Sequence, residues 1–126
     1  MTIANQHHVL VVEDEYFLAS DLRDSLEGEG MIVVGPVANE ADALALLDNS
    51  EIDCAVLDIN LNGRMSYSVA QTLRDRGIPF LFVTGYDTAA EGSTFDDVEL
   101  IQKPFSRQAV VDTIARLTTG GAQPST

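Results

Sequence analysis

Cysteine, long apolar runs and positive charge are all scarce in this sequence. Cys54 is the only cysteine, so the chain forms no internal disulfide. Because it lies in the apolar run 54–57, we expect it to be a small buried core residue and not a reactive thiol. No secretory signal is present, and no apolar stretch approaches the roughly 20 residues that a membrane span needs. We therefore expect a cytoplasmic protein without membrane contact.

The shortage of positive charge limits the partners of the chain. Seven lysines and arginines stand against 20 aspartates and glutamates, which gives a formal net charge of −13. Nucleic acids are bound through lysine and arginine side chains that neutralise phosphates, and an acidic chain repels those phosphates. We therefore expect no direct nucleic-acid binding, and we interpret most of the acidity as a contribution to solubility.

Length and composition predict one folded domain. The chain has 126 residues, of which 45% are hydrophobic. A domain of this size buries roughly two-thirds of the surface that its unfolded chain exposes, enough for one core. We place the domain at residues 1–119 and interpret the polar residues 120–126 as a disordered C-terminal tail.

Five short apolar runs have the length and β-branching of buried strands. They span residues 8–13, 32–34, 53–58, 79–84 and 98–101, and Gly35-Pro36 closes the second. Helical spacing of apolar residues predicts helices over about 15–29, after an N-cap at Asn39, after a cap at Ser66 and around 110–117. We expect a further short helix around 88–92, between the fourth and fifth strands. Residues 60–63 have the composition of a loop.

This alternation of strand and helix predicts an α/β fold with a doubly wound, five-stranded parallel sheet and five helices. The expected strand order is 2-1-3-4-5, which reverses the winding direction between the first and third strands. Ligands of such sheets bind beyond the carboxyl ends of the strands at that reversal. Glu13, Asp14 and Asp58 end these two strands. Fold and chemistry therefore point to one place.

Two further chemical groups end strands of the predicted sheet. Thr84 ends the fourth strand, and Lys103 follows the fifth. Three carboxylates crowded together repel one another unless a cation joins them, and a hard divalent metal with oxygen ligands is the natural candidate. An anion sharing the site would use Thr84 and Lys103. Metal, anion and a reactive carboxylate together indicate phosphoryl chemistry.

Each of these residues also has an ordinary structural explanation. Asp14 suits a helix N-cap, and Asp58 suits a turn. Thr84 suits a strand as a β-branched residue, although the following Gly85 would let a bound anion approach the backbone. Because the adjacent Glu13 adds a second carboxylate where one would serve as a cap, the combined pattern favours a metal site.

Four stretches in this order resemble the receiver domain of two-component response regulators. They are Val-Val-Glu-Asp-Glu at 11–15, Val-Leu-Asp at 56–58, Phe-Val-Thr-Gly at 82–85 and Lys-Pro-Phe at 103–105. The resemblance covers the chain from about His8 to Leu117 and implies a flavodoxin-like fold. Phe-Val-Thr-Gly-Tyr at 82–86 also resembles a Phe-Xaa-Thr-Gly-aromatic signature of stand-alone receivers.

The resemblance implies a role for each site residue. Asp58 would be the phosphoacceptor, and Asp14 and Asp58 would be direct ligands of Mg²⁺. Glu13 would act on the metal mostly through water, and Asn60 would offer its backbone carbonyl.

Lys103 would contact the phosphoryl oxygens, and Thr84 would be the switch hydroxyl. The partners implied are a sensor histidine kinase or phosphotransferase and an unknown downstream protein, bound through residues 88–117. The resemblance implies a single-domain regulator that is a monomer or weak dimer. It would be a signalling domain with limited self-catalysed phosphorylation and dephosphorylation, not an enzyme.

The sequence departs from the family pattern at two places. The aromatic residue usual three positions before the lysine is Leu100 here, so Tyr86 either supplies the switch aromatic or is an exposed loop tyrosine. The loop after the acceptor, residues 59–63, lacks the common Met-Pro.

Two alternatives stay open. A haloacid-dehalogenase-like phosphatase also uses a strand-end aspartate with Mg²⁺, but it needs an acid where this chain has Asn60. A phosphate-independent adaptor, a pseudo-receiver, would be expected to lack some of the acidic residues that are present.

Overall fold

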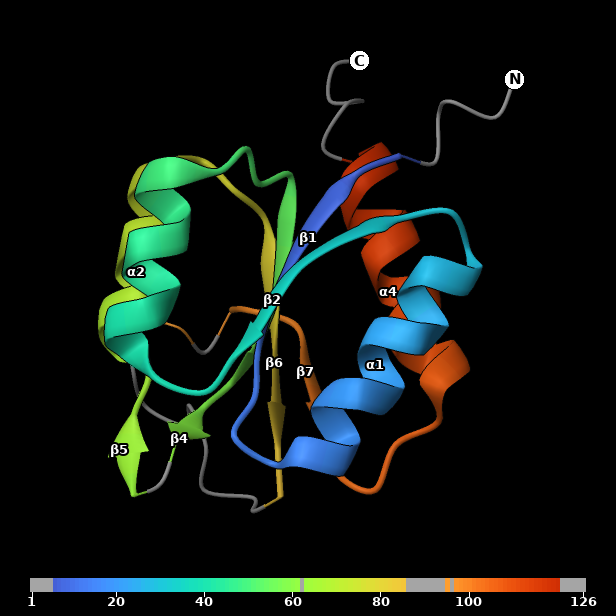
Figure 1. Cartoon of the computed structure of the whole chain (residues 1–126), viewed down its shortest axis with the longest axis horizontal. Coiled ribbons are helices and arrows are strands. Elements are labelled where there is room, and N and C mark those ends of the chain that lie inside the picture. The colour runs from blue at the N-terminus through green and yellow to red at the C-terminus, as the bar shows by residue number, and fades with distance from the viewer. Residues whose placement is uncertain (1–5, 62, 86–94, 96, 121–126) are drawn as a thin grey trace.

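The computed structural model alternates strands and helices along the chain (Figure 1) and describes residues 6–61, 63–85, 95 and 97–120. The main sheet contains β1 (His8–Val12), β2 (Ile32–Val37), β3 (Cys54–Asp58), β6 (Phe80–Thr84) and β7 (Leu100–Gln102). The helices are α1 (Tyr16–Gly28), α2 (Glu40–Asn49), α3 (Tyr67–Asp75) and α4 (Arg107–Gly120). The short strands β4 (Asn60–Leu61) and β5 (Arg64–Met65) pair with each other in an antiparallel ribbon.

The five strands of the main sheet are parallel and lie in the order β2-β1-β3-β6-β7. This is the predicted order 2-1-3-4-5, which is therefore confirmed. Val12 pairs with Leu57, and Asp58 pairs with Val83. The carboxyl ends of β1, β3 and β6 therefore meet at one edge of the sheet, where the winding direction reverses.

Helices cover both faces of the sheet, with α1 and α4 on one side and α2 and α3 on the other (Figure 1). Side chains of a strand alternate between the faces, so Val9 and Val11 of β1 pack with α1 and α4, while Leu10 and Val12 pack with α2 and α3. Cys54 is fully buried, as predicted. Its pKa is raised to about 12 because burial disfavours the thiolate.

The core on the α2 and α3 side contains a cluster of aromatic rings. Phe95 is buried and stacks on Tyr67 of α3, with ring centroids 5.4 Å apart. It also meets the edges or faces of Phe80 and Phe82 at 6.4 and 6.0 Å. The guanidinium carbon of Arg74 lies 4.9 Å from the centre of the Phe95 ring. Phe95 thereby ties the chain between β6 and β7 to α3.

Helix boundaries agree closely with the sequence predictions. The side chain of Asn39 caps α2 by accepting a hydrogen bond of 2.8 Å from the backbone N–H of Asp42. The structure describes four of the five predicted helices, since the segment 88–92 lies outside the described residues. Helix α4 reaches Gly120, the residue at which the tail was predicted to begin, and residues 121–126 are likewise outside.

Three strand predictions differ from the structure. The second strand does not close at Gly35-Pro36 but runs on to Val37, whose carbonyl accepts a hydrogen bond from the backbone N–H of Glu13. Gly35 adopts φ of 100°, which favours glycine, and an outer strand tolerates a proline that donates no hydrogen bond. The last strand is Leu100–Gln102, later than predicted, and the expected loop at 60–63 includes the first strand of the ribbon.

Within the described residues, no helix is both long and apolar enough to span a membrane.

Candidate functional site

An open pocket of about 460 Å³ lies at the edge of the sheet where β1 and β3 end. Its walls come from segments far apart in the sequence: Asp14, Glu15, Asp58, Asn60, Gly63, Gly85 and Lys103. The parallel register brings these segments together, because it places the carboxyl ends of neighbouring strands side by side. The pocket is therefore where the sequence predicted a site.

The three predicted carboxylates converge there. One oxygen each from Glu13, Asp14 and Asp58 lies within 4.8 Å of the others. Glu13 and Asp58 are buried, and Asp14 is partly exposed. Three carboxylates at this spacing repel one another, and oxygen donors of this kind suit a hard divalent cation.

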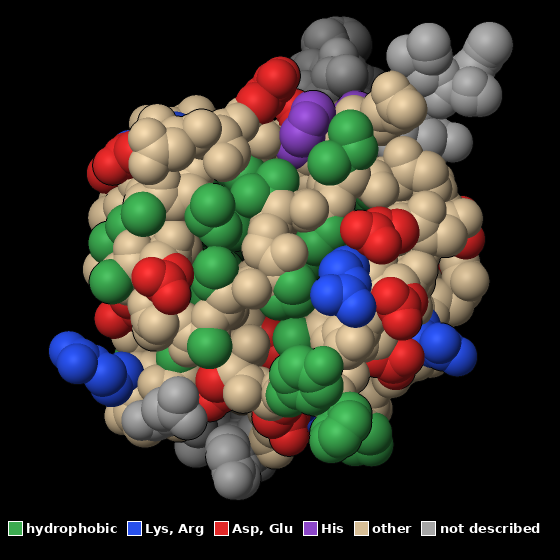
Figure 2. Space-filling view, viewed as in Figure 1, with side chains coloured by type: hydrophobic (Ala, Val, Ile, Leu, Met, Phe, Trp, Pro, Cys, Tyr) green, Lys and Arg blue, Asp and Glu red, His purple; other side chains and the backbone are tan. Residues whose placement is uncertain are grey.

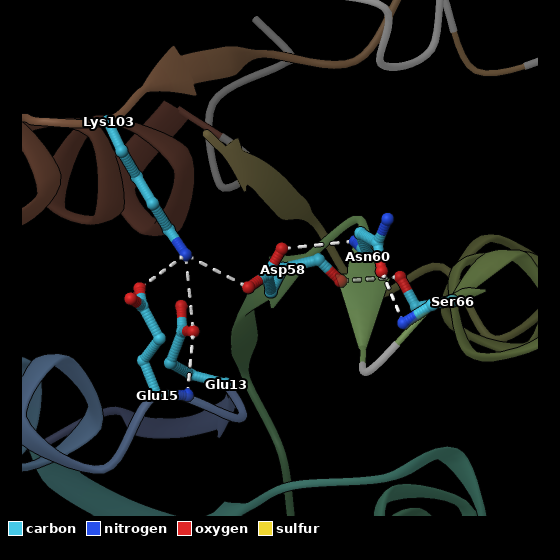
Figure 3. A network of polar contacts seen from close by, with 7 residues as sticks. Glu13, Glu15, Asp58, Asn60, Ser66 and Lys103 are labelled. Atoms are coloured by element: carbon cyan, nitrogen blue, oxygen red, sulfur yellow. Dashed lines mark hydrogen bonds and ion pairs between the residues drawn. The ribbon is translucent and has the colours of Figure 1, made fainter. Parts of the chain in front are cut away.

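Lys103 reaches into the same cluster from the segment after β7 (Figure 3). Its ammonium donates to Glu15 at 2.9 Å, to Asp58 at 3.0 Å and to Glu13 at 3.2 Å. Burial alone would lower the lysine pKa, but the hydrogen bonds and charges of these carboxylates outweigh it, so the pKa is raised. Lys103 is therefore a permanent cation at the centre of the cluster.

Glu13 is a buried acid with a perturbed pKa. Its pKa is raised to about 8 by burial first and then by the neighbouring Asp58. Its Oε2 accepts from the backbone N–H of Glu15 at 3.1 Å and from Lys103, whereas its buried Oε1 has no hydrogen-bond partner among the residues that the structure describes. A buried oxygen without a partner is costly, and a proton, a water or a metal would satisfy it. The donor set thus fits Mg²⁺.

Asp58 is held by the backbone that follows it (Figure 3). Its Oδ1 accepts a hydrogen bond of 3.0 Å from the backbone N–H of Asn60. Its carbonyl oxygen accepts one of 2.7 Å from the hydroxyl of Ser66. Asn60 in turn accepts from the backbone N–H of Gly63 through its Oδ1, which closes the turn of the ribbon. These bonds fix the carboxylate at the end of β3.

The predicted role of Ser66 as a side-chain cap of the third helix is wrong. Ser66 occupies the N-cap position of α3 but makes no side-chain capping bond. Its hydroxyl donates to Asp58 instead, because the ribbon between β3 and α3 brings the two residues together. The sequence indicates only that serine is a common N-cap residue, and it does not show which acceptor its hydroxyl meets in the folded protein.

Thr84 ends β6 as predicted and is buried. Its carbonyl accepts a hydrogen bond of 2.7 Å from the backbone N–H of Lys103, which binds the two segments together. A Cβ added at Gly85 would lie 3.8 Å from the Lys103 side chain, an ordinary contact, so packing against the lysine does not require glycine there. Tyr86 lies outside the described residues.

One residue of the site was missed by the sequence reasoning. Glu15 makes the shortest of the three contacts to Lys103, at 2.9 Å. The available signal was its place in the acidic run 13–15, directly after the first predicted strand. Its partner lies 88 positions further along the chain, so only the fold reveals the pair.

The architecture and the clustered acids define a class, the receiver domains of signalling proteins. The chain belongs to the response regulator receiver domain family, whose model matches residues 9–115. Members of this family act in two-component systems and are signalling domains, not enzymes in the usual sense.

Two relatives illustrate the similarity. The regulatory protein VanR of Enterococcus faecium is 35% identical over 101 residues, which are 77% of this chain and 43% of the relative. The solution structure of SdrG from Sphingomonas melonis Fr1 is 40% identical with a TM-score of 0.78, and the match covers 90% of this chain and 97% of SdrG. The chain spans less than half the length of the first curated relatives that it matches.

SdrG has also been solved in a second state. The solution structure of the beryllofluoride-activated conformation of SdrG, from Pseudomonas melonis Fr1, matches with 38% sequence identity and a TM-score of 0.74. This match covers 94% of this chain and 99% of SdrG. A receiver protein of Sinorhizobium medicae, 23% identical with a TM-score of 0.83, shares the fold.

Proposed function

We propose that the chain is a single-domain response regulator whose Asp58 accepts a phosphoryl group from a phosphohistidine of a sensor histidine kinase or phosphotransferase. The observation that carries the proposal is the contact of Asp58 with the ammonium of Lys103, inside a cluster of carboxylates. A carboxylate oxygen of Asp58 forms a bond to phosphorus as the bond from phosphorus to the histidine nitrogen breaks. The products are an acyl phosphate on Asp58 and a free histidine on the donor.

We assign the metal to the acidic cluster. Asp14, Asp58 and the backbone carbonyl of Asn60 would hold Mg²⁺ directly, with Glu13 acting through water. Support comes from the convergence of three carboxylates and from the buried Oε1 of Glu13, which no group in the described part of the chain hydrogen-bonds. When bound, Mg²⁺ neutralises negative charge that develops on the oxygens of the transferring group.

The protein's own groups perform the remaining work. The bonds to the Asp58 carboxylate and carbonyl keep its side chain in one orientation, which favours attack along one line. Lys103 supplies positive charge to the phosphoryl oxygens, and the Thr84 hydroxyl donates a hydrogen bond to one of them. Because these two residues are joined through their backbones, we expect their movement to change the binding of a downstream protein through residues 88–117, of which 88–94 and 96 lie outside the described residues.

The surface beside the site suits a protein donor. Tyr16 and Phe17 at the start of α1 are exposed by 76% and 84%, and their rings meet edge to face. Figure 2 shows hydrophobic side chains gathered over this part of the molecule. A second open pocket of about 550 Å³ extends from Phe17 to Lys103 and Phe105. We propose that the phosphoryl donor docks against this surface. We also propose that the phosphoryl transfer takes place in the cytoplasm and that the chain is a monomer or weak dimer.

The test is incubation with Mg²⁺ and acetyl phosphate, followed by intact mass. The wild type and Asp75→Asn, a control at an exposed aspartate of α3, are expected to gain the mass of one phosphoryl group (HPO₃) when Mg²⁺ is present. Asp58→Asn is expected to gain none. If the wild type gains no phosphate and binds no beryllofluoride, the phosphate-independent adaptor becomes the better function.

A further inference from the structure

The ammonium of Lys103 is fully engaged in the structure. An ammonium carries three N–H donors, and three carboxylates, those of Glu13, Glu15 and Asp58, accept from it at 2.9 to 3.2 Å. A phosphoryl group on Asp58 adds oxygens that need the same donors. One of the present acceptors therefore has to give up its bond.

The surroundings of the three acceptors differ. The side chain of Glu13 is only 1% exposed, and its Oε2 also accepts from the backbone of Glu15. The side chain of Asp58 is 4% exposed and carries the reaction itself. The side chain of Glu15 is 62% exposed, so its carboxylate exchanges the lysine for water at little cost. Glu15 is therefore the acceptor that yields.

We infer that Glu15 is a positioning residue that competes with the phosphoryl group for Lys103. It holds the ammonium while Asp58 is unmodified and is displaced when the phosphoryl group arrives. This inference rests on the proposed function of Asp58. Glu15 would thereby lower the affinity of the site for a phosphoryl group or another anion.

The negative charge of Glu15 also opposes binding of the phosphoryl group, as its competition for Lys103 does. Glu15 lines the pocket and places a negative charge beside the position of the incoming phosphoryl group, which it repels. An exposed ion pair has a free energy that corresponds to about a 1.4- to 5-fold change in an equilibrium constant. Glu15→Gln is expected to raise the affinity for a phosphoryl mimic by roughly 2- to 5-fold at low salt.

The first measurement follows Lys103 directly. It is the only lysine in the sequence, so selective ¹⁵N-lysine labelling gives one side-chain ammonium signal by NMR. The free wild type and free Glu15→Gln are expected to differ in this signal, because the wild type has the extra carboxylate. With Mg²⁺ and beryllofluoride the two signals are expected to coincide, because Glu15 has left the ammonium.

The second measurement is a beryllofluoride titration at saturating Mg²⁺. Glu51→Gln is the matched control, since it removes one exposed carboxylate before β3, at the opposite end of the strand from the site. Glu15→Asp keeps the charge on a shorter side chain and is expected to fall between the wild type and Glu15→Gln. The gain in Glu15→Gln is expected to shrink as salt is raised, because salt screens exposed charges.

Two results overturn the inference while leaving the proposed function intact. In the first, the wild type binds beryllofluoride, but Glu15→Gln binds it no better than Glu51→Gln does. In the second, the ammonium signals still differ between the two bound proteins, which means that Glu15 stays on Lys103. A wild type that neither gains a phosphate on Asp58 nor binds beryllofluoride overturns the proposed function and the inference together.

Discussion

The hydroxyl of Ser66 donates a hydrogen bond of 2.7 Å to the carbonyl oxygen of Asp58, and both residues are buried. The bond joins the end of β3 to the start of α3 across the ribbon. It gives the backbone of Asp58 a fixed partner that does not depend on the charge of the carboxylate.

Ser66→Ala is expected to lower the free energy of unfolding by about 1–3 kcal/mol, because it leaves a buried carbonyl oxygen without its partner. The measurement is equilibrium unfolding in urea. Ser68→Ala is the control, since the Ser68 hydroxyl bonds to Glu40 on the exposed surface. An equal loss of unfolding free energy in both variants would show that the buried bond of Ser66 stabilises the fold no more than the exposed bond of Ser68 does.

The raised pKa of Glu13 predicts a pH dependence of stability. Its folded-state pKa is about 8 against an ordinary value of 4.5, so the folded state binds this proton more tightly than the unfolded state does. The unfolded state therefore releases it first as pH rises, and the free energy of unfolding falls between these two pKa values. Without Mg²⁺, the wild type is expected to lose more Tm from pH 5 to pH 8 than Glu13→Gln loses, a comparison that removes the contribution of other groups. Parallel pH curves for the two proteins would contradict the shift.

Replacing Lys103 tests the competition between the ammonium and a metal. Lys103→Met removes a cation that lies 3.0 Å from Asp58 and 3.2 Å from Glu13. The freed carboxylates are expected to bind Mg²⁺ more tightly, by at least about 1 kcal/mol or roughly 5-fold in Kd, because these contacts are more buried than the exposed pairs for which that value is typical. The measurement is the gain in Tm with rising Mg²⁺. Arg116→Met, which removes the partner of Glu99, serves as the control and is expected to leave that gain unchanged.

Phe95 and Phe17 offer a matched pair of aromatic substitutions. Phe95 is 4% exposed within a cluster of rings, whereas Phe17 is 84% exposed. Phe95→Ala is expected to cost about 3–5 kcal/mol of unfolding free energy. Phe17→Ala is expected to change it by about 0.5 kcal/mol or less. Chemical denaturation measures both, and a small loss in Phe95→Ala would mean that this anchor contributes little.

The sheet was predictable because its signals are local. Apolar runs such as 54–57 have the length of strands, and helical periodicity follows most of them, which is enough to predict the alternation. The strand order follows from this alternation together with the topology of doubly wound sheets. The strand-end carboxylates could be grouped for the same reason, and the structure brings Glu13, Asp14 and Asp58 together. Their roles in metal binding and phosphoryl transfer stay predictions.

Other features depend on contacts that no local pattern records. A Gly-Pro pair such as Gly35-Pro36 usually ends a strand. Only the contact with β1 shows that β2 continues to pair as far as Val37. Serine before a helix suggests a cap, and only the ribbon turns the hydroxyl of Ser66 toward Asp58. Contacts between residues far apart in sequence decided these cases, against the local preference.

Gly35-Pro36 also has a consequence for how the protein behaves at high concentration. It lies in β2, an outer strand, and open strand edges invite pairing between molecules. Pro36 offers no N–H to a neighbouring strand, and the pairing of β2 with β1 shifts register near it. At Gly35 an added Cβ would lie 3.1 Å from the carbonyl oxygen of Val11, so larger residues are resisted there. Pro36, which misplaced the end of β2 in the sequence analysis, and the register shift beside it thus oppose fibre-like growth from this side of the molecule.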